Sequence, residues 1–155
     1  MTIYGNTRGK SFLAVLLALF FILAFAGCRS DSSLDFKTPA GETVTVTVDD
    51  SDDFSVKDKN GRAEVLQKQK VMLTCEFIDK KTAQAKLSTM DQFRDSSAVH
   101  SREGDSVAYE ITGQQGRVSY YLFPVTDESY VFGYTYLPWD AADAVKARIS
   151  FTEKK

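Results

Sequence analysis

The stretch YEITGQQGRVSYYLFPVTDESYVFGYTYLP, Tyr109–Pro138, contains the most regular pattern in this chain of 155 residues. Apolar and β-branched residues recur there in three runs, which are separated by GQQG and DES. Short polar connections between such runs are typical of antiparallel hairpins. We therefore predict three consecutive strands, Val107–Thr112, Arg117–Thr126 and Tyr130–Leu137, that form an antiparallel meander.

The third of these strands carries an aromatic residue at every second position. Tyr130, Phe132, Tyr134 and Tyr136 share one of its faces, and Trp139 follows closely. One interpretation is that a helix covers this face, which is the commoner fate of aromatic stripes. The other is that part of the face stays open to a partner protein or a glycan. The candidate binding residues are then Tyr130, Tyr134, Tyr136 and Trp139.

Strands are also predicted before the meander. Alternating Val and Thr from Thr43 to Val48 indicate a strand with one face in the core. Asn60 and Gly61 form the centre of a hairpin turn that leads toward a further strand, Val71–Ile78. These segments place most of the predicted sheet in consecutive antiparallel strands.

Two segments have a helical period instead. In residues 79–94, DKKTAQAKLSTMDQFR, apolar residues recur every three or four positions and Asp79 can cap the start. Residues 95–106 are predicted to be a loop. In residues 139–148, WDAADAVKAR, acidic residues come first and basic residues last, which suits a helix dipole. Residues 149–155 are predicted to add a closing strand.

This order of elements predicts an α+β fold, an antiparallel sheet with two helices packed on it. The order resembles the PsbP-like or Mog1-like group of small domains over Thr43–Glu153, through the stretch quoted above and AADAVKARISFTE. The resemblance implies a domain used for binding or assembly and not for catalysis. A β-sandwich and a cystatin-like sheet remain alternatives.

The N-terminus has the layout of a secretory signal. Arg8 and Lys10 precede an apolar run, Ser11–Ala26, which is short for a membrane span of about 20 residues. The following AFAGC, Ala24–Cys28, resembles the lipobox of bacterial lipoproteins, although Phe25 stands where Leu is commonest. The resemblance implies cleavage before Cys28 and attachment of lipid to its sulfur. An uncleaved signal anchor and a chance cysteine remain alternatives.

The chain is therefore divided into three parts: a lipoprotein signal peptide, 1–27; a lipidated N-terminus and flexible tether, 28–41; and a single α+β domain, 42–155. The tether is predicted from its polar composition and its final Pro39 and Gly41. The implied location is the face of the cell membrane or outer membrane toward the periplasm or the exterior.

Cys75 is the only other cysteine. It shares a strand face with Val71, Leu73 and Phe77, so we expect a buried thiol with no reactive role. If Cys28 carried no lipid, a disulfide between Cys28 and Cys75 would be the alternative.

Charge argues against nucleic acid as a partner. Only two of the 19 basic residues and none of the 21 acidic residues precede Cys28, so removing the leader changes the formal charge from −2 to −4. No basic cluster is available to displace counterions from phosphates. The partners predicted instead are the membrane, through Cys28, and an envelope protein or glycan.

Known catalytic patterns are weak in this sequence. The acidic run Asp49–Asp53 lacks the Gly and Glu that an EF-hand loop needs at its sixth and twelfth positions. The only histidine, His100, lies near Ser97 and Ser101 without an identifiable carboxylate partner. We therefore predict no cofactor, no metal and no enzymatic activity. The expected function is a membrane-anchored binding or assembly module, and the alternative is an extracytoplasmic protein that binds a small molecule or a glycan.

Overall fold

The computed structural model describes residues 31–92, 97–114 and 116–155. These residues form β-strands, two α-helices and one short 3-10 helix, η1. In chain order the elements are β1 (Asp31–Lys37), β2 (Thr43–Asp49), η1 (Ser51–Asp53), β3 (Phe54–Lys59), β4 (Arg62–Gln67), β5 (Lys70–Asp79), α2 (Lys80–Gln92), β6 (Ser97–Glu103), β7 (Ser106–Gly113), β8 (Gly116–Pro124), β9 (Ser129–Thr135), α3 (Trp139–Lys146) and β10 (Ile149–Glu153).

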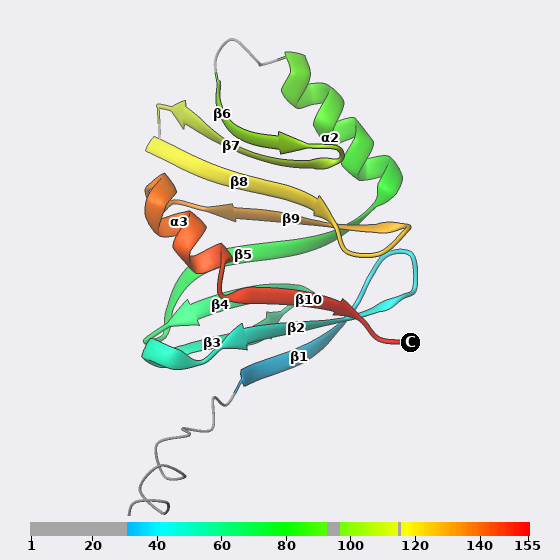
Figure 1. The fold of residues 1–155 in the computed structure, drawn as a ribbon, viewed down its shortest axis with the longest axis vertical. Helices are drawn as coiled ribbons and strands as arrows, with labels where there is room; N and C mark the ends of the chain where they lie inside the picture. The colour runs from blue at the N-terminus through cyan, green and yellow to red at the C-terminus, as the bar shows by residue number, and fades with distance from the viewer. Residues whose placement is uncertain (1–30, 93–96, 115) are drawn as a thin grey trace, which may run out of the picture.

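The strands are divided between two antiparallel sheets. A small sheet has the order β1-β2-β10, and a large sheet has the order β3-β4-β5-β9-β8-β7-β6. The small sheet contacts the large one through β1 and β2, which lie against β3. Figure 1 shows that β6, β7 and β8 extend well beyond the small sheet, with α3 beside them. The face of the large sheet that is turned toward the small sheet and α3 is called the inner face below.

One apolar core joins the two sheets and α3. Val44, Val46 and Val48 of the small sheet have no exposed surface, and their alternation with threonines is the predicted one. Phe36 of β1 stacks on Phe77 of β5 with ring centroids 5.3 Å apart. Burial of side chains from both sheets in the same cluster fixes how the sheets face each other.

A second apolar cluster lies on the opposite, outer face of the large sheet. Helix α2 contributes the fully buried Ala83, which packs with Ile78 of β5 and Tyr130 of β9. Asp79 caps this helix as predicted, because its Oδ1 accepts a hydrogen bond of 2.7 Å from the backbone N–H of Thr82. Of the predicted helix 79–94, residues 93 and 94 lie outside the described residues.

The predicted α+β fold is wrong. The structure is mostly β, with two antiparallel sheets and two short helices added to them, and not one sheet on which helices form a layer. The α+β arrangement implied by the resemblance to PsbP-like and Mog1-like domains is wrong for the same reason. The closing strand β10 was predicted, but it pairs with β2 in a separate sheet and not with the meander.

The predicted tether is wrong over 31–37. These residues form β1, which pairs with β2 in register from Asp31 opposite Asp49 to Lys37 opposite Thr43. The remainder, residues 38–41, makes a tight turn in which Gly41 N donates to Thr38 O at 2.9 Å. The first strand therefore begins only three positions after Cys28.

Other local predictions differ in their outcome. The three meander strands and the helix that begins at Trp139 are confirmed. The Asn60-Gly61 turn is confirmed as well, since both residues have a positive φ, 57° and 80°. The predicted loop 95–106 is wrong over Ser97–Glu103, because this segment pairs with β7 as the edge strand β6.

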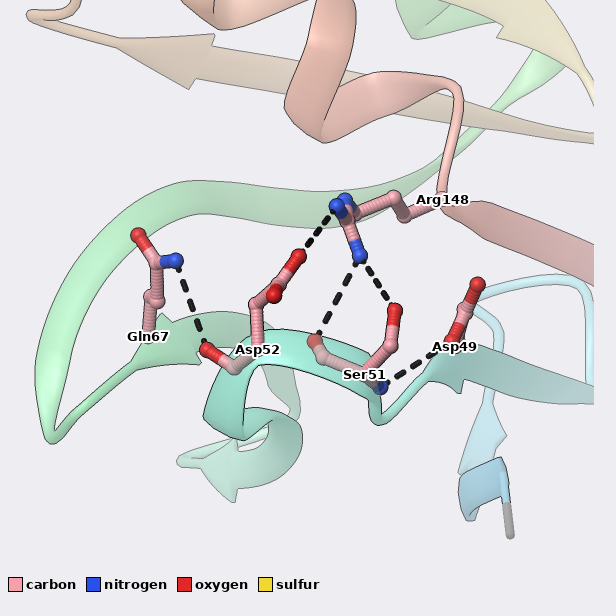
Figure 2. A network of polar contacts seen from close by, with 5 residues as sticks. All are labelled: Asp49, Ser51, Asp52, Gln67 and Arg148. Atoms are coloured by element: carbon pink, nitrogen blue, oxygen red, sulfur yellow. Dashed lines mark hydrogen bonds and ion pairs between the residues drawn. The ribbon is translucent and has the colours of Figure 1, made fainter. Parts of the chain in front are cut away.

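Arg148, between α3 and β10, connects the small sheet to the turn that leads into the large one. Its guanidinium donates to Ser51 Oγ at 2.7 Å and forms an ion pair with Asp52 at 2.7 Å, as Figure 2 shows. Its Cζ lies 4.7 Å from the centroid of the Phe54 ring. The backbone carbonyl of Arg148 also accepts a hydrogen bond from Asp49 N. One side chain thus holds η1, in which Asp52 has a left-handed φ of 60°.

Replacing this arginine tests its role in joining the sheets. We expect Arg148→Ala to lower the free energy of unfolding by about 1–3 kcal/mol, since it removes charged hydrogen bonds from a partly buried site. Urea unfolding followed by circular dichroism measures the change. The matched control is Arg62→Ala, which breaks an exposed pair with Glu76 and should change stability by less than about 1 kcal/mol. Equal losses in the two variants would contradict this role.

Candidate functional site

The four aromatic residues predicted to bind a partner do not form one surface. Tyr130 is buried, with 3% of its surface exposed, and its hydroxyl donates to Asp105 at 2.9 Å. Tyr134 is half-buried, whereas Tyr136 is 74% exposed. Trp139 lies on the inner side of the large sheet, where its ring stacks on Tyr121 at 5.7 Å. The structure therefore does not bring these four residues together, although Tyr134 and Tyr136 line one groove.

The outer face of the large sheet carries a row of stacked rings, here called the outer tyrosine row: Tyr109, Tyr120, Phe132 and Tyr134. Tyr109 and Tyr120 stack at 5.0 Å, and Tyr120 and Phe132 stack at 5.6 Å. The ammonium of Lys86, from α2, lies 3.9 Å from the centroid of the Phe132 ring. A shallow groove of about 430 Å³ remains between α2 and this row. The helix thus covers part of the aromatic face and leaves part open.

A larger cleft lies on the inner face, where β6, β7 and β8 extend beyond the small sheet. Its volume is about 650 Å³, within the range of sites for small ligands. We call it the inner cleft. Strands β6 to β8 form one side of it, and α3 and β10 form the other. The lining residues used below are Tyr121, Phe123, Lys146 and Phe151.

Aromatic rings and a cation meet in the inner cleft. Phe123 of β8 packs edge to face on Phe151 of β10, with centroids 5.3 Å apart. Lys146 Nζ lies 5.9 Å from the ring centroids of both Tyr121 and Phe123. Within the described part of the chain, Lys146 has no carboxylate partner. The cleft therefore combines an apolar wall with the ammonium of Lys146, which forms no ion pair with a described carboxylate, although Glu103 also lines the cleft.

Tyr121 is one of the residues that line this cleft, and its buried hydroxyl is an unsatisfied polar atom. The residue is 2% exposed, and its hydroxyl has no hydrogen-bond partner among the described residues. A buried hydroxyl in this condition costs about 1–3 kcal/mol. Burial, together with the negative charge of Asp143, raises the pKa of the Tyr121 phenol. The hydroxyl therefore stays protonated near neutral pH and is available as a donor.

These groups define what the inner cleft can bind. An apolar portion of a ligand would contact Phe123 and Phe151, and an anionic portion would approach Lys146. A hydrogen-bond acceptor that reached Tyr121 would satisfy its hydroxyl. The chemistry is that of an amphipathic anion of small-molecule size.

The other sequence candidates show no such convergence. The carboxylates of Asp49 and Asp52 contact Ser51 N and Arg148, respectively. Over the described ranges, no three His, Cys, Asp or Glu side chains are placed to hold a metal ion. His100 belongs to β6, beside a bulge in its pairing with β7, and its side chain lies outside what is described.

Cys28, the predicted lipid-attachment residue, lies outside the described residues. In the part of the chain that the structure describes, neither helix is long and apolar enough to cross a bilayer. Prediction from sequence also missed the inner cleft. The sequence did indicate that Tyr121 and Phe123 share the strand face opposite to that of Tyr120. It did not indicate that β10 and α3 would lie against Tyr121 and Phe123.

Comparisons with protein-family models, with curated proteins and with solved structures gave no match to this chain.

Cys75 lies in the core beside Gly133, whose missing side chain leaves room for the sulfur. It is 1% exposed, and a Cβ at position 133 would lie 3.7 Å from its Sγ. Burial raises the pKa of this thiol from 9.0 to about 12. The thiol is thus protonated and inert in the folded protein, as predicted for a core residue.

The raised pKa makes stability depend on pH. The unfolded chain loses the Cys75 proton near pH 9, whereas the folded chain keeps it until about pH 12. The contribution of Cys75 to the free energy of unfolding should therefore be constant below pH 9 and fall between pH 9 and 12. Urea unfolding at pH 8, 9.5 and 10.5 measures the fall, and Cys75→Ala should show a shallower one. The same slope in both proteins would contradict the assignment.

Proposed function

We propose that the protein is an exported lipoprotein, attached to a membrane through Cys28, whose two-sheet domain binds a small amphipathic anion in the inner cleft. The signal layout and the AFAGC motif support the anchor. The observation that supports the ligand is the convergence of Lys146, Tyr121 and Phe123 in one cleft of about 650 Å³. Of the two functions expected from sequence, this favours small-molecule binding over protein assembly.

The proposal is binding and not catalysis. A catalytic base or nucleophile at neutral pH needs a pKa near 7, or an adjacent group that removes its proton. Burial moves the pKa of Tyr121 in the opposite direction. Tyr121 therefore supports recognition by a neutral donor.

The anchor is tested by the mass of the exported protein. We expect the mature chain to begin at Cys28 and to carry a diacylglyceryl group, with two or more acyl chains giving stable attachment. Intact-mass spectrometry of the membrane fraction measures both features. Cys28→Ala should remain unprocessed and lack the lipid, while Cys75→Ala should be processed normally. A diacylglyceryl-free Cys28 in the exported wild type would refute the anchor.

The inner cleft is tested with 8-anilinonaphthalene-1-sulfonate, a fluorescent probe that combines aromatic rings with a sulfonate. We expect saturable binding near one probe per chain. Lys146→Gln should weaken it about tenfold, the equivalent of roughly 1.4 kcal/mol. Tyr121→Phe should weaken it less, because it removes a donor and keeps the ring.

The control for this titration is Lys86→Gln, which removes the corresponding cation beside Phe132 on the outer face. Its affinity for the probe should match the wild type. Thermal unfolding of each variant excludes probe binding to a loosened core. Equal weakening by Lys86→Gln and Lys146→Gln would show that the probe does not use the inner cleft.

A further inference from the structure

The first strand of the domain begins very close to the proposed anchor. Only Arg29 and Ser30 separate Cys28 from the first residue of β1, Asp31. A fully extended chain spans at most ~3.6 Å per residue, so this connection reaches about 11 Å. The headgroup layer of one leaflet is about 5–7 Å thick. A domain attached in this way lies against the membrane surface and is not lifted away from it.

The end of the domain where β1 starts is formed by several turns, which we call the anchor-side edge. Asp31 pairs with Asp49, and η1 follows directly after β2. Lys68 N, in the turn between β4 and β5, donates to Asp53 O at 3.2 Å. At the next strand, Thr135 Oγ1 donates to Met72 O at 2.6 Å. In Figure 1 the start of β1, η1, the start of β5 and the end of β9 all lie along the left of the domain.

Two exposed apolar side chains lie at this edge. Among the described residues, the exposed large apolar side chains are Leu34, Val71 and Tyr136. Val71 is 43% exposed and Tyr136 is 74% exposed, and both line one shallow groove of about 310 Å³ beside Lys70. The third exposed apolar residue, Leu34, belongs to β1 and does not line this groove. A tyrosine, an aliphatic residue and a lysine form the combination found where proteins meet the bilayer interface.

Charge at this edge is mixed. Lys68 and Lys70 have no carboxylate partner within the described ranges, and Asp52 is paired with Arg148. The acidic run Asp49–Asp53 offsets the lysines, so attraction to anionic lipid is not the main contribution. Contact through Val71 and Tyr136 depends on apolar surface, which salt does not screen.

We propose that the anchor-side edge, through Val71, Tyr136 and the stem of Lys70, docks on the lipid surface that holds Cys28. This proposal rests on the proposed anchor. It fixes the orientation of the domain: the β3–β4 hairpin points away from the membrane, because β3 begins at η1 and ends at Lys59. Docking gives the protein a second contact with the membrane, in addition to its acyl chains.

The test uses the full lipidated protein in vesicles of phosphatidylcholine, with and without phosphatidylglycerol. A nitroxide is attached at Lys70→Cys, or at Lys59→Cys in the hairpin as the matched control; Cys75 is buried and Cys28 is acylated. Collision with a water-soluble nickel chelate should be at least fivefold lower at position 70 than at 59 in both lipids. Adding Val71→Ser and Tyr136→Ser should bring the two positions within twofold, with unchanged thermal unfolding.

The outcomes separate the two proposals. Equal nickel access at positions 70 and 59, in protein whose mass shows the diacylglyceryl group, would overturn the docking and leave the anchor intact. An unmodified Cys28 would overturn the anchor and the docking with it. Protection at position 70 only with phosphatidylglycerol would overturn the apolar contact in favour of charge.

Discussion

The pairing of β10 with β2 is the constraint on which the rest of the structure depends. Strand β10, the last in the chain order, pairs with one side of β2, and β1 pairs with the other. The small sheet therefore has β2 at its centre. Phe151 of β10 then enters the core between the sheets, where it contacts Phe77 and Phe123. Because α3 precedes β10 directly, this pairing also places Lys146 over the large sheet. The position of the inner cleft is thus a consequence of a long-range strand pairing.

Local patterns predicted the elements with strong periodicity. The valines of β2, the meander and the Asp79 cap of α2 are confirmed because each depends on neighbours within a few residues. The strands β1 and β6 were missed. Both are edge strands, which have one partner and need few apolar residues. In β1 the sequence DSSLDFK contributes chiefly Phe36 to the core.

The division into two sheets could not be predicted in the same way. The residues of β2 and β10 are far apart in the chain, and the alternation in either strand fits any antiparallel partner. The candidate site could not be predicted for the same reason. Tyr134 and Tyr136 were predicted as binding residues because aromatic residues alternate on their strand. Tyr121 and Lys146, in contrast, come together only through the packing of α3 on β8. Sequence identified the aromatic strands, and tertiary contacts decide which of their faces is open.

Residues 139–149 contribute both to stability and to the proposed binding site. Its first residue packs on the Tyr121 ring, Lys146 lies beside the same ring, and Arg148 holds η1 through Asp52. The unpartnered Tyr121 hydroxyl opposes folding, since a phenylalanine there would bury the same ring without an unsatisfied donor. Stability alone does not account for that hydroxyl, nor for a lysine that forms no ion pair with any described carboxylate. Both residues line the inner cleft, as the proposed binding site requires, and the Arg148 contacts offset part of the cost by fixing the segment that carries Lys146.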